Sequence, residues 1–295
     1  MVTPDPCMTQ AVLDQGLWTS AREGDFETCA KLLAQGANPE NSDSLALRSA
    51  SRCGHVECVK LLRPFSNAKA CDSQALRDAA VGGHLECVRL LIPASEPRAR
   101  QSLALRLVSE RGFVGCLMLL IPVSDVVADE SSALCIAAEN GHVECVNLLL
   151  EACSDPDRKN SHALILAAQN DHIEIAKVLA PLASPKHQAL AFESACEFGA
   201  AECAQLLIHC VDSPQMLDRS LRSAINGGHA DVFLLLTNHA RTPGYNPLLT
   251  SIRKTALRKG HDRLATILLA LIERNSIGDS SEVDLYPSKK IVPRL

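Results

Sequence analysis

A nearly constant spacing of glycine-containing turns runs through the 295-residue chain. Gly-His or a close variant recurs about every 29 residues, and a period of that length kept over most of a chain is typical of a solenoid of stacked units. The repeat therefore predicts one elongated domain, although length alone would suggest two globular ones. The turns begin at Gly24, Gly54, Gly83, Gly112, Gly141, Asp171, Gly199, Gly228 and Gly260.

The residues before each turn predict a helix. A large apolar residue stands seven before the turn and a small one four before it, as in Leu47 and Ala50, so both lie on one helical face. The turn glycine supplies the left-handed residue that ends this helix. A serine ten before the turn is placed to cap the helix in several units: Ser44, Ser73, Ser102, Ser131 and Ser161.

A second helix is predicted after each turn. A glutamate in its first turn suits the helix dipole, and a Leu-Leu pair such as Leu148-Leu149 forms its apolar stripe. A proline ten residues after the turn, as at Pro64, stops it. Each unit is thus predicted to be a helix, a tight turn, an antiparallel helix and a loop, with Leu148 in the core.

These units resemble ankyrin repeats, most clearly in Ala21-Arg-Glu-Gly-Asp and in Ala137-Ala-Glu-Asn-Gly-His-Val-Glu-Cys. The resemblance covers about residues 12–274 and implies an all-α, ankyrin-like helix-turn-helix solenoid of about nine stacked repeats, a curved rod. The period falls short of the family's 33 residues, so we expect short loops where ankyrins carry a β-hairpin finger. Residues 1–11 are expected to form an N-terminal lead. Residues 275–295 are expected to form a flexible tail, with docking of Val283 and Leu285 on the last repeat as the alternative.

Cysteine and histidine also recur in phase with the turns. Equivalent residues of stacked helices lie about 8–10 Å apart, too far for a shared zinc ion or a disulfide, so the cysteines are predicted to fill the core. Cys53 and Cys135 fall outside this register and are expected to be exposed thiols. The histidine after each turn is predicted to bond free backbone groups at the helix ends. The in-phase cysteines are Cys58, Cys87, Cys116, Cys145 and Cys203.

The two residues before each turn vary while their neighbours do not. In the family that the chain resembles, these positions line the concave face and touch partners; neutral drift of exposed positions is the alternative. The candidate contacts here are Arg52, Arg111, Glu139, Asn140, Gln169, Asn170 and Phe198, with Phe198 as the aromatic anchor. An arginine stripe lies six residues before the turn, at Arg48, Arg77, Arg106 and Arg222. Arg77, Arg106 and Arg222 are further candidate contacts, which would hold an acidic partner segment or instead pair with nearby acids and loop carbonyls.

Composition restricts the function further. The net charge of -5 and 3% aromatic content argue against nucleic acid and anionic membranes as partners. No segment is long enough to span a bilayer, and neither a signal peptide nor a nucleotide or metalloprotease motif is found. An odd count of 13 cysteines favours a reducing cytosol.

We therefore expect a monomeric, cytoplasmic scaffold or adaptor that binds another protein on its concave face. No catalytic residue, metal or cofactor is expected. The resemblance also suggests a bacterial effector-type ankyrin protein, which would act in the host cytosol if exported. Two alternatives stay open: a thiol-dependent enzyme or redox-sensitive regulator that uses an exposed cysteine, and a nucleic-acid binder that uses the arginine stripe.

Overall fold

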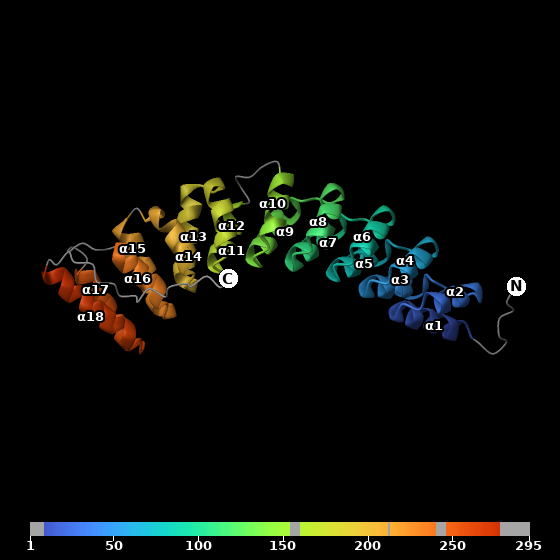
Figure 1. Ribbon diagram of the computed structural model, residues 1–295, viewed down its shortest axis with the longest axis horizontal. Coiled ribbons are helices and arrows are strands. Elements are labelled where there is room, and N and C mark those ends of the chain that lie inside the picture. Colours follow the sequence, from blue (N-terminus) through green and yellow to red (C-terminus); the bar gives the residue numbers. More distant parts are fainter. Residues whose placement is uncertain (1–8, 154–159, 212, 240–245, 278–295) are drawn as a thin grey trace, which may run out of the picture. The chain divides into compact units, whose positions relative to one another are not determined.

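The computed structural model describes residues 9–153, 160–211, 213–239 and 246–277, which form α-helices and short 3-10 helices without a strand among them (Figure 1). They belong to two compact units. The first holds the described residues up to Ala195 together with Glu202–Cys210, and the second holds Cys196–Ala201 and the described residues from Val211 onward.

In the first unit, the first and second helices of successive repeats follow one another along the chain as predicted. From α1 to α12 the two helices of each repeat pack on each other, and the first helices also pack in succession from α1 to α11. The described residues therefore confirm stacked helix-turn-helix repeats. The helices are α1 (Gln10–Glu23), α2 (Phe26–Ala34), α3 (Asn41–Cys53), α4 (Val56–Leu62), α5 (Ala70–Val81), α6 (Leu85–Leu91), α7 (Ala99–Arg111), α8 (Val114–Leu120), α9 (Ala128–Glu139), α10 (Val143–Ala152), α11 (Asn160–Gln169), α12 (Ile173–Leu179), α13 (Pro185–Phe198) and α14 (Ala201–Leu207), the last two reaching into both units.

The second unit continues the same plan with two further helix pairs. α15 packs on α16 and on α17, and α17 packs on α18. These helices are α15 (Pro214–Gly227), α16 (Ala230–His239), α17 (Asn246–Arg258) and α18 (Asp262–Ile277). The predicted tail from residue 278 onward lies outside the described residues; α18 itself extends to Ile277, beyond the predicted end of the solenoid at 274.

The core is aliphatic, but one position in it differs from the prediction. Leu149 is fully buried and Leu148 only partly buried, so the second leucine of the pair faces the core. The reason is helical spacing, because Cys145 and Leu149 are four residues apart and lie on one face together with Val146. The choice of Leu148 as the core residue was wrong by one position.

The tight turns are as predicted. Gly54 has φ 77° at the end of α3, and the other turn glycines are also left-handed. Asp171 takes this conformation in its repeat with φ 58°. Glu57 lies in the first turn of α4, which ends at Leu62, and a 3-10 helix over Arg63–Phe65 contains Pro64.

Short connections replace a finger in the first repeats. After the 3-10 helix Arg63–Phe65, four residues lead to a left-handed turn at the start of α5, where Cys71, Asp72 and Ser73 have φ between 50° and 62°. The same turn begins α3 and α7. It costs energy in L-residues, so other groups must support it.

The serines ten before the turn have a role different from the predicted cap. Ser44, Ser73 and Ser102 are fully buried, and each accepts a hydrogen bond from the backbone N–H of the following connection. Because the left-handed turn points these hydroxyls toward the next repeat, they join repeats and do not cap their own helix. The bonds run from Asn67 N to Ser44 Oγ (2.9 Å), from Glu96 N to Ser73 Oγ (2.7 Å) and from Asp125 N to Ser102 Oγ (2.8 Å). Ser161 is 4% exposed, and its hydroxyl has no hydrogen-bond partner among the described residues. The side chain of Ser131 lies outside the described residues.

Replacing one of these serines should weaken the stack. Ser73→Ala removes the acceptor for the Glu96 N–H, and losing such a bond costs about 1–2 kcal/mol in the free energy of unfolding. Ser42→Ala, at an exposed serine, is the matched control and should change it by less than about 0.5 kcal/mol. Equal midpoints of urea unfolding for the two variants would contradict the role assigned to Ser73.

Candidate functional site

At five of the turns a histidine forms a hydrogen bond to the repeat before it. Nε2 of His84 lies 3.0 Å from the carbonyl oxygen of Arg52, and since a carbonyl only accepts, the imidazole is the donor. The prediction that these histidines bond backbone groups at helix ends is confirmed, with the acceptor in the preceding repeat. The other pairs are His55 with Arg22, His142 with Glu110, His172 with Glu139 and, in the second unit, His229 with Glu197.

The acceptor in every pair is a residue two before a turn, which is one of the variable positions. Its carbonyl is held by a histidine while its side chain is free to differ; Arg52 and Glu139, for example, are exposed. In the first unit, the backbone at this position is bonded in the same way from repeat to repeat, whereas the side chains differ. We call the exposed or partly exposed side chains of Arg22, Arg52, Glu110, Arg111, Glu139, Asn140, Gln169 and Asn170 the variable face.

The predicted contacts on the variable face keep free hydrogen-bonding groups. Asn140 and Asn170 each donate one amide hydrogen bond to a carbonyl of their own helix, at 2.8 and 2.9 Å. Their amide oxygens remain as acceptors. The pair between Arg111 and Glu110, 3.6 Å apart on the surface, is too weak to hold either side chain in place. Gln169 is only partly exposed.

Phe198 is described within the second unit, where its side chain is 52% exposed. An aromatic side chain of this exposure is a strong candidate for a partner contact. The sequence placed it correctly on the surface.

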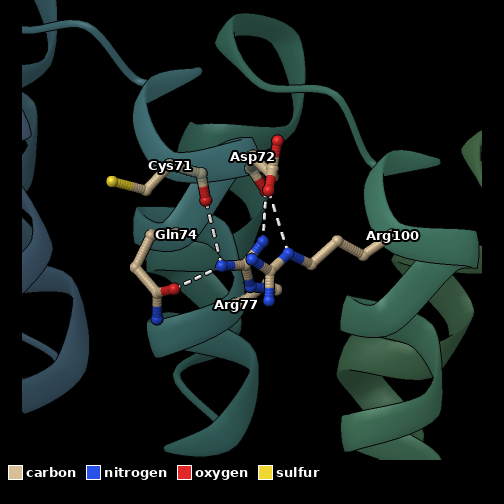
Figure 2. Close-up of polar contacts among 5 residues, drawn as sticks. All are labelled: Cys71, Asp72, Gln74, Arg77 and Arg100. Carbon is tan, nitrogen blue, oxygen red and sulfur yellow. Dashed lines mark hydrogen bonds and ion pairs between the residues drawn. The ribbon is translucent and has the colours of Figure 1, made fainter.

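The arginine stripe is largely structural, the alternative that the sequence left open. Arg77 is 6% exposed, and its guanidinium donates to the carbonyl oxygens of Asp72 and Cys71 and to the side chain of Gln74 (Figure 2). The two carbonyls belong to the left-handed turn that begins α5. Arg77 therefore stabilises this turn and is not available to a partner.

Neighbouring charges complete the cluster around Arg77. Arg100, from α7, donates to Oδ2 of Asp72 at 2.9 Å and so links two repeats (Figure 2). Gln74 donates to Oδ1 of Asp78 at 2.8 Å. Burial raises the pKa of Asp78, and the hydrogen bond from Gln74 and the positive charges nearby oppose this shift. Asp72 and Arg100 are exposed, whereas Arg77 is buried against the turn that it bonds.

The other stripe residues give a mixed result. Arg48 and Arg106 occupy the position of Arg77 in α3 and α7, which begin with the same turn, and both are partly buried. In the second unit, Arg222 pairs with Asp218 at 2.8 Å, one turn earlier in α15. These arginines have bonding partners or cover within the fold, which weakens their candidacy as partner contacts.

The cysteines in phase with the turns are core residues. Cys58, Cys87 and Cys145 are at most 1% exposed. Burial raises the pKa of the Cys58 thiol to about 12 and that of Cys87 to about 11, so neither forms the reactive thiolate near neutral pH. Cys53 is exposed as expected, whereas Cys135 is 8% exposed, and its assignment as an exposed thiol was wrong.

Alkylation of the native protein should separate the two classes of thiol. At pH 8, iodoacetamide should modify the exposed Cys53 and Cys71 first, and Cys58, Cys87 and Cys203 at least about tenfold more slowly because burial holds their pKa values above the working pH. Mass spectrometry of timed digests measures each rate. A buried cysteine that reacts faster than Cys53 would contradict this assignment and favour a thiol-dependent enzyme.

Two searches of the described residues give negative results. No group of three or more His, Cys, Asp or Glu side chains in these ranges is arranged to hold a metal ion. None of the helices described has the length and apolar character needed to cross a bilayer.

Comparison with known proteins agrees with the repeat geometry. A family model described as ankyrin repeats (three copies) matches residues 17–101 and 105–189, more than half of the chain. The crystal structure of the human ASB11 ankyrin repeat domain matches with 23% identity and a TM-score of 0.49, over 56% of this chain and 82% of that one. A search of the curated proteins finds no match. The stacked helix pairs, the left-handed turns and this family match together place the chain in the ankyrin repeat family.

Proposed function

We propose that the chain is an adaptor that binds another protein through the variable face, without chemistry of its own. Ankyrin repeats are generally protein–protein interaction modules. One observation in this chain supports the proposal most. The backbone of that face is fixed by hydrogen bonds, in which histidines donate to the carbonyls of residues whose side chains are exposed.

This arrangement limits the entropy that binding costs. A surface whose backbone is already fixed loses little freedom when a partner docks, so more of the contact energy appears as affinity. Arg52 and Arg111 offer cations, Glu139 offers an anion, and Asn140 and Asn170 offer amides. Such mixed polar groups fit a folded protein surface better than a nucleic acid, which would require a continuous basic stripe.

The chemistry of the cysteines supports the same proposal. The described cysteines are free thiols, as a reducing cytoplasm would keep them. The raised pKa values of the buried Cys58, Cys87, Cys135 and Cys203 disfavour these four as the nucleophile of a thiol-dependent enzyme. The effector interpretation uses the same face and differs only in the partner.

Charge reversal on two faces tests the proposal. The native chain, an Arg52→Glu/Arg111→Glu variant and a Lys60→Glu/Lys177→Glu variant are used to capture proteins from the source cells. Lys60 and Lys177 are exposed cations on the second helices α4 and α12, each paired only with a glutamate of its own helix. The captured protein is then purified and its Kd for each chain is measured.

The expected result is a partner that binds the native chain and the second-helix variant alike and loses at least about tenfold in affinity for the Arg52→Glu/Arg111→Glu variant, a change of about 1.4 kcal/mol. A partner lost only by the second-helix variant would overturn the proposal. So would the absence of any partner specific to the native chain.

A further inference from the structure

The exposed end of the last repeat has an apolar centre. Leu257, on α17, is 47% exposed. The residue three before the turn is 0% exposed in every preceding repeat, where another repeat follows: Ala21, Ser51, Ala80, Ser109, Ala138, Ala168, Cys196 and Ile225. Leu257 is therefore a large apolar side chain at a position that the fold otherwise covers.

Five cations stand near Leu257 in the sequence. We call Arg253, Lys254, Arg258, Lys259 and Arg263 the terminal basic patch; all are exposed except Arg253, which is partly buried. None of the five makes an ion pair or side-chain hydrogen bond with the rest of the described chain, and Nε of Arg253 is buried without a partner. The helix dipole accounts for Arg258 at the end of α17, but it disfavours Arg263 in the first turn of α18.

The sequence after α18 has the complementary composition. Residues 279–286 read Asp-Ser-Ser-Glu-Val-Asp-Leu-Tyr, with three carboxylates and three apolar side chains. The segment begins two residues after Ile277, the last residue of α18. An acidic and apolar peptide is what a basic patch with an apolar centre would hold.

The length of the connection also fits. Leu264 stands about as far after the last turn as Leu257 stands before it, and from there α18 rises about 20 Å to Ile277 at roughly 1.5 Å per residue. An extended chain spans about 3.3 Å per residue, so roughly six residues after Ile277 are enough to return along α18 to the level of Leu264. That distance carries Val283, Asp284 and Leu285 to the level of Leu257.

We propose that the segment Asp279–Tyr286 docks along α17 of its own chain, with Val283 or Leu285 against Leu257 and its carboxylates on the terminal basic patch. In this arrangement the segment covers Leu257 in the last repeat, as a following repeat covers the equivalent residue in the others. This role is independent of the variable face.

Zero-length crosslinking of the full chain tests the docking. A water-soluble carbodiimide joins amines to carboxylates in direct contact, and we expect bonds from Lys254 or Lys259 to Asp279, Glu282 or Asp284. Lys69 and Glu96, an exposed pair 3.1 Å apart, provide the internal positive control. An equimolar mixture of unlabelled and ¹⁵N-labelled chains distinguishes contacts within one chain from contacts between two copies.

The apolar contact is tested by a variant that keeps every charge. Leu257→Ser should lower the yield of these crosslinks at least about threefold, while Leu182→Ser, at another exposed leucine (40%), should leave it unchanged. Mixed-isotope crosslinks would assign the patch to a second copy and overturn the proposal. A formed Lys69–Glu96 crosslink without any crosslink from residues 279–286 would overturn it as well, as would equal yields for the two leucine variants.

Discussion

Leu149→Arg should unfold a large part of the first unit. Leu149 is fully buried on the face of α10 that also carries Cys145 and Val146, so the variant would place an unpaired guanidinium in an aliphatic core. Burying an uncompensated charge and losing the leucine contacts together cost at least about 4 kcal/mol. Because each repeat is stabilised mainly by its neighbours, the loss should spread beyond α10. Thermal unfolding followed by circular dichroism measures the effect.

The same helix supplies the control. Asn147→Arg introduces the same side chain at an exposed position of α10 and should change the free energy of unfolding by less than about 0.5 kcal/mol. A Leu149→Arg variant that melts like the parent would contradict the register of the repeat.

Gly54→Ala should strongly destabilise the first unit, because the added methyl group is unfavourable both for the backbone and for the packing of the turn. Gly54 has φ 77°, and a Cβ there would lie 2.6 Å from Cε1 and 2.8 Å from Cγ of His84. The left-handed conformation alone costs an L-residue about 1–2 kcal/mol. Displacing the imidazole from the Arg52 carbonyl adds about 1 kcal/mol more. We therefore expect a loss of about 3 kcal/mol in the free energy of unfolding, measured by urea titration.

A matched glycine separates the two effects. Gly260 is the same turn residue in the last repeat, with φ 76° and no atom within 4 Å of an added Cβ. Gly260→Ala should show only the backbone cost. In a double-mutant cycle, His84→Ala should reduce the penalty of Gly54→Ala by about 1 kcal/mol or more. If the two substitutions were additive, the close packing of histidine on glycine would not be what Gly54 provides.

The repeat architecture could be predicted from sequence because its signals are local. A turn glycine, an apolar residue seven before it and a proline ten after it each specify backbone conformation within a few residues, and repetition averages out the exceptions. The cysteines were assigned to the core by the same logic. The error at Leu148 arose because two adjacent leucines are about 100° apart on a helix, and only contacts with other helices decide which one faces the core.

The connections between repeats could not be predicted in the same way. Ser73 was interpreted as a cap because caps are the common local use of serine, whereas its actual partner, the Glu96 N–H, lies in the connection to the next repeat. Arg77 was left between two interpretations because its acceptors depend on a left-handed turn that no local residue signals. The shared spacing of Ser73 and Arg77 with Ser44 and Arg48 was the available hint that both serve the fold.

In the candidate site, too, local features could be predicted from the sequence and contacts between repeats could not. Sequence variation between repeats identified which side chains differ, and the exposure of Arg52, Arg111 and Glu139 agrees with that choice. The histidine bonds that fix the backbone beneath the variable face cross from one repeat to the next, so they became visible only in three dimensions.

Side-chain footprinting of the complex tests the binding face most directly. Hydroxyl radicals oxidise exposed sulfur and aromatic groups, and this chain has natural probes on both kinds of surface: Cys53 beside Arg52, and Phe65 and Met118, which are 59% and 58% exposed at the second-helix side of their repeats. With the purified partner bound, oxidation of Cys53 should fall at least about threefold while Phe65 and Met118 react as before. Protection of Phe65 or Met118 with an unchanged Cys53 would contradict the account.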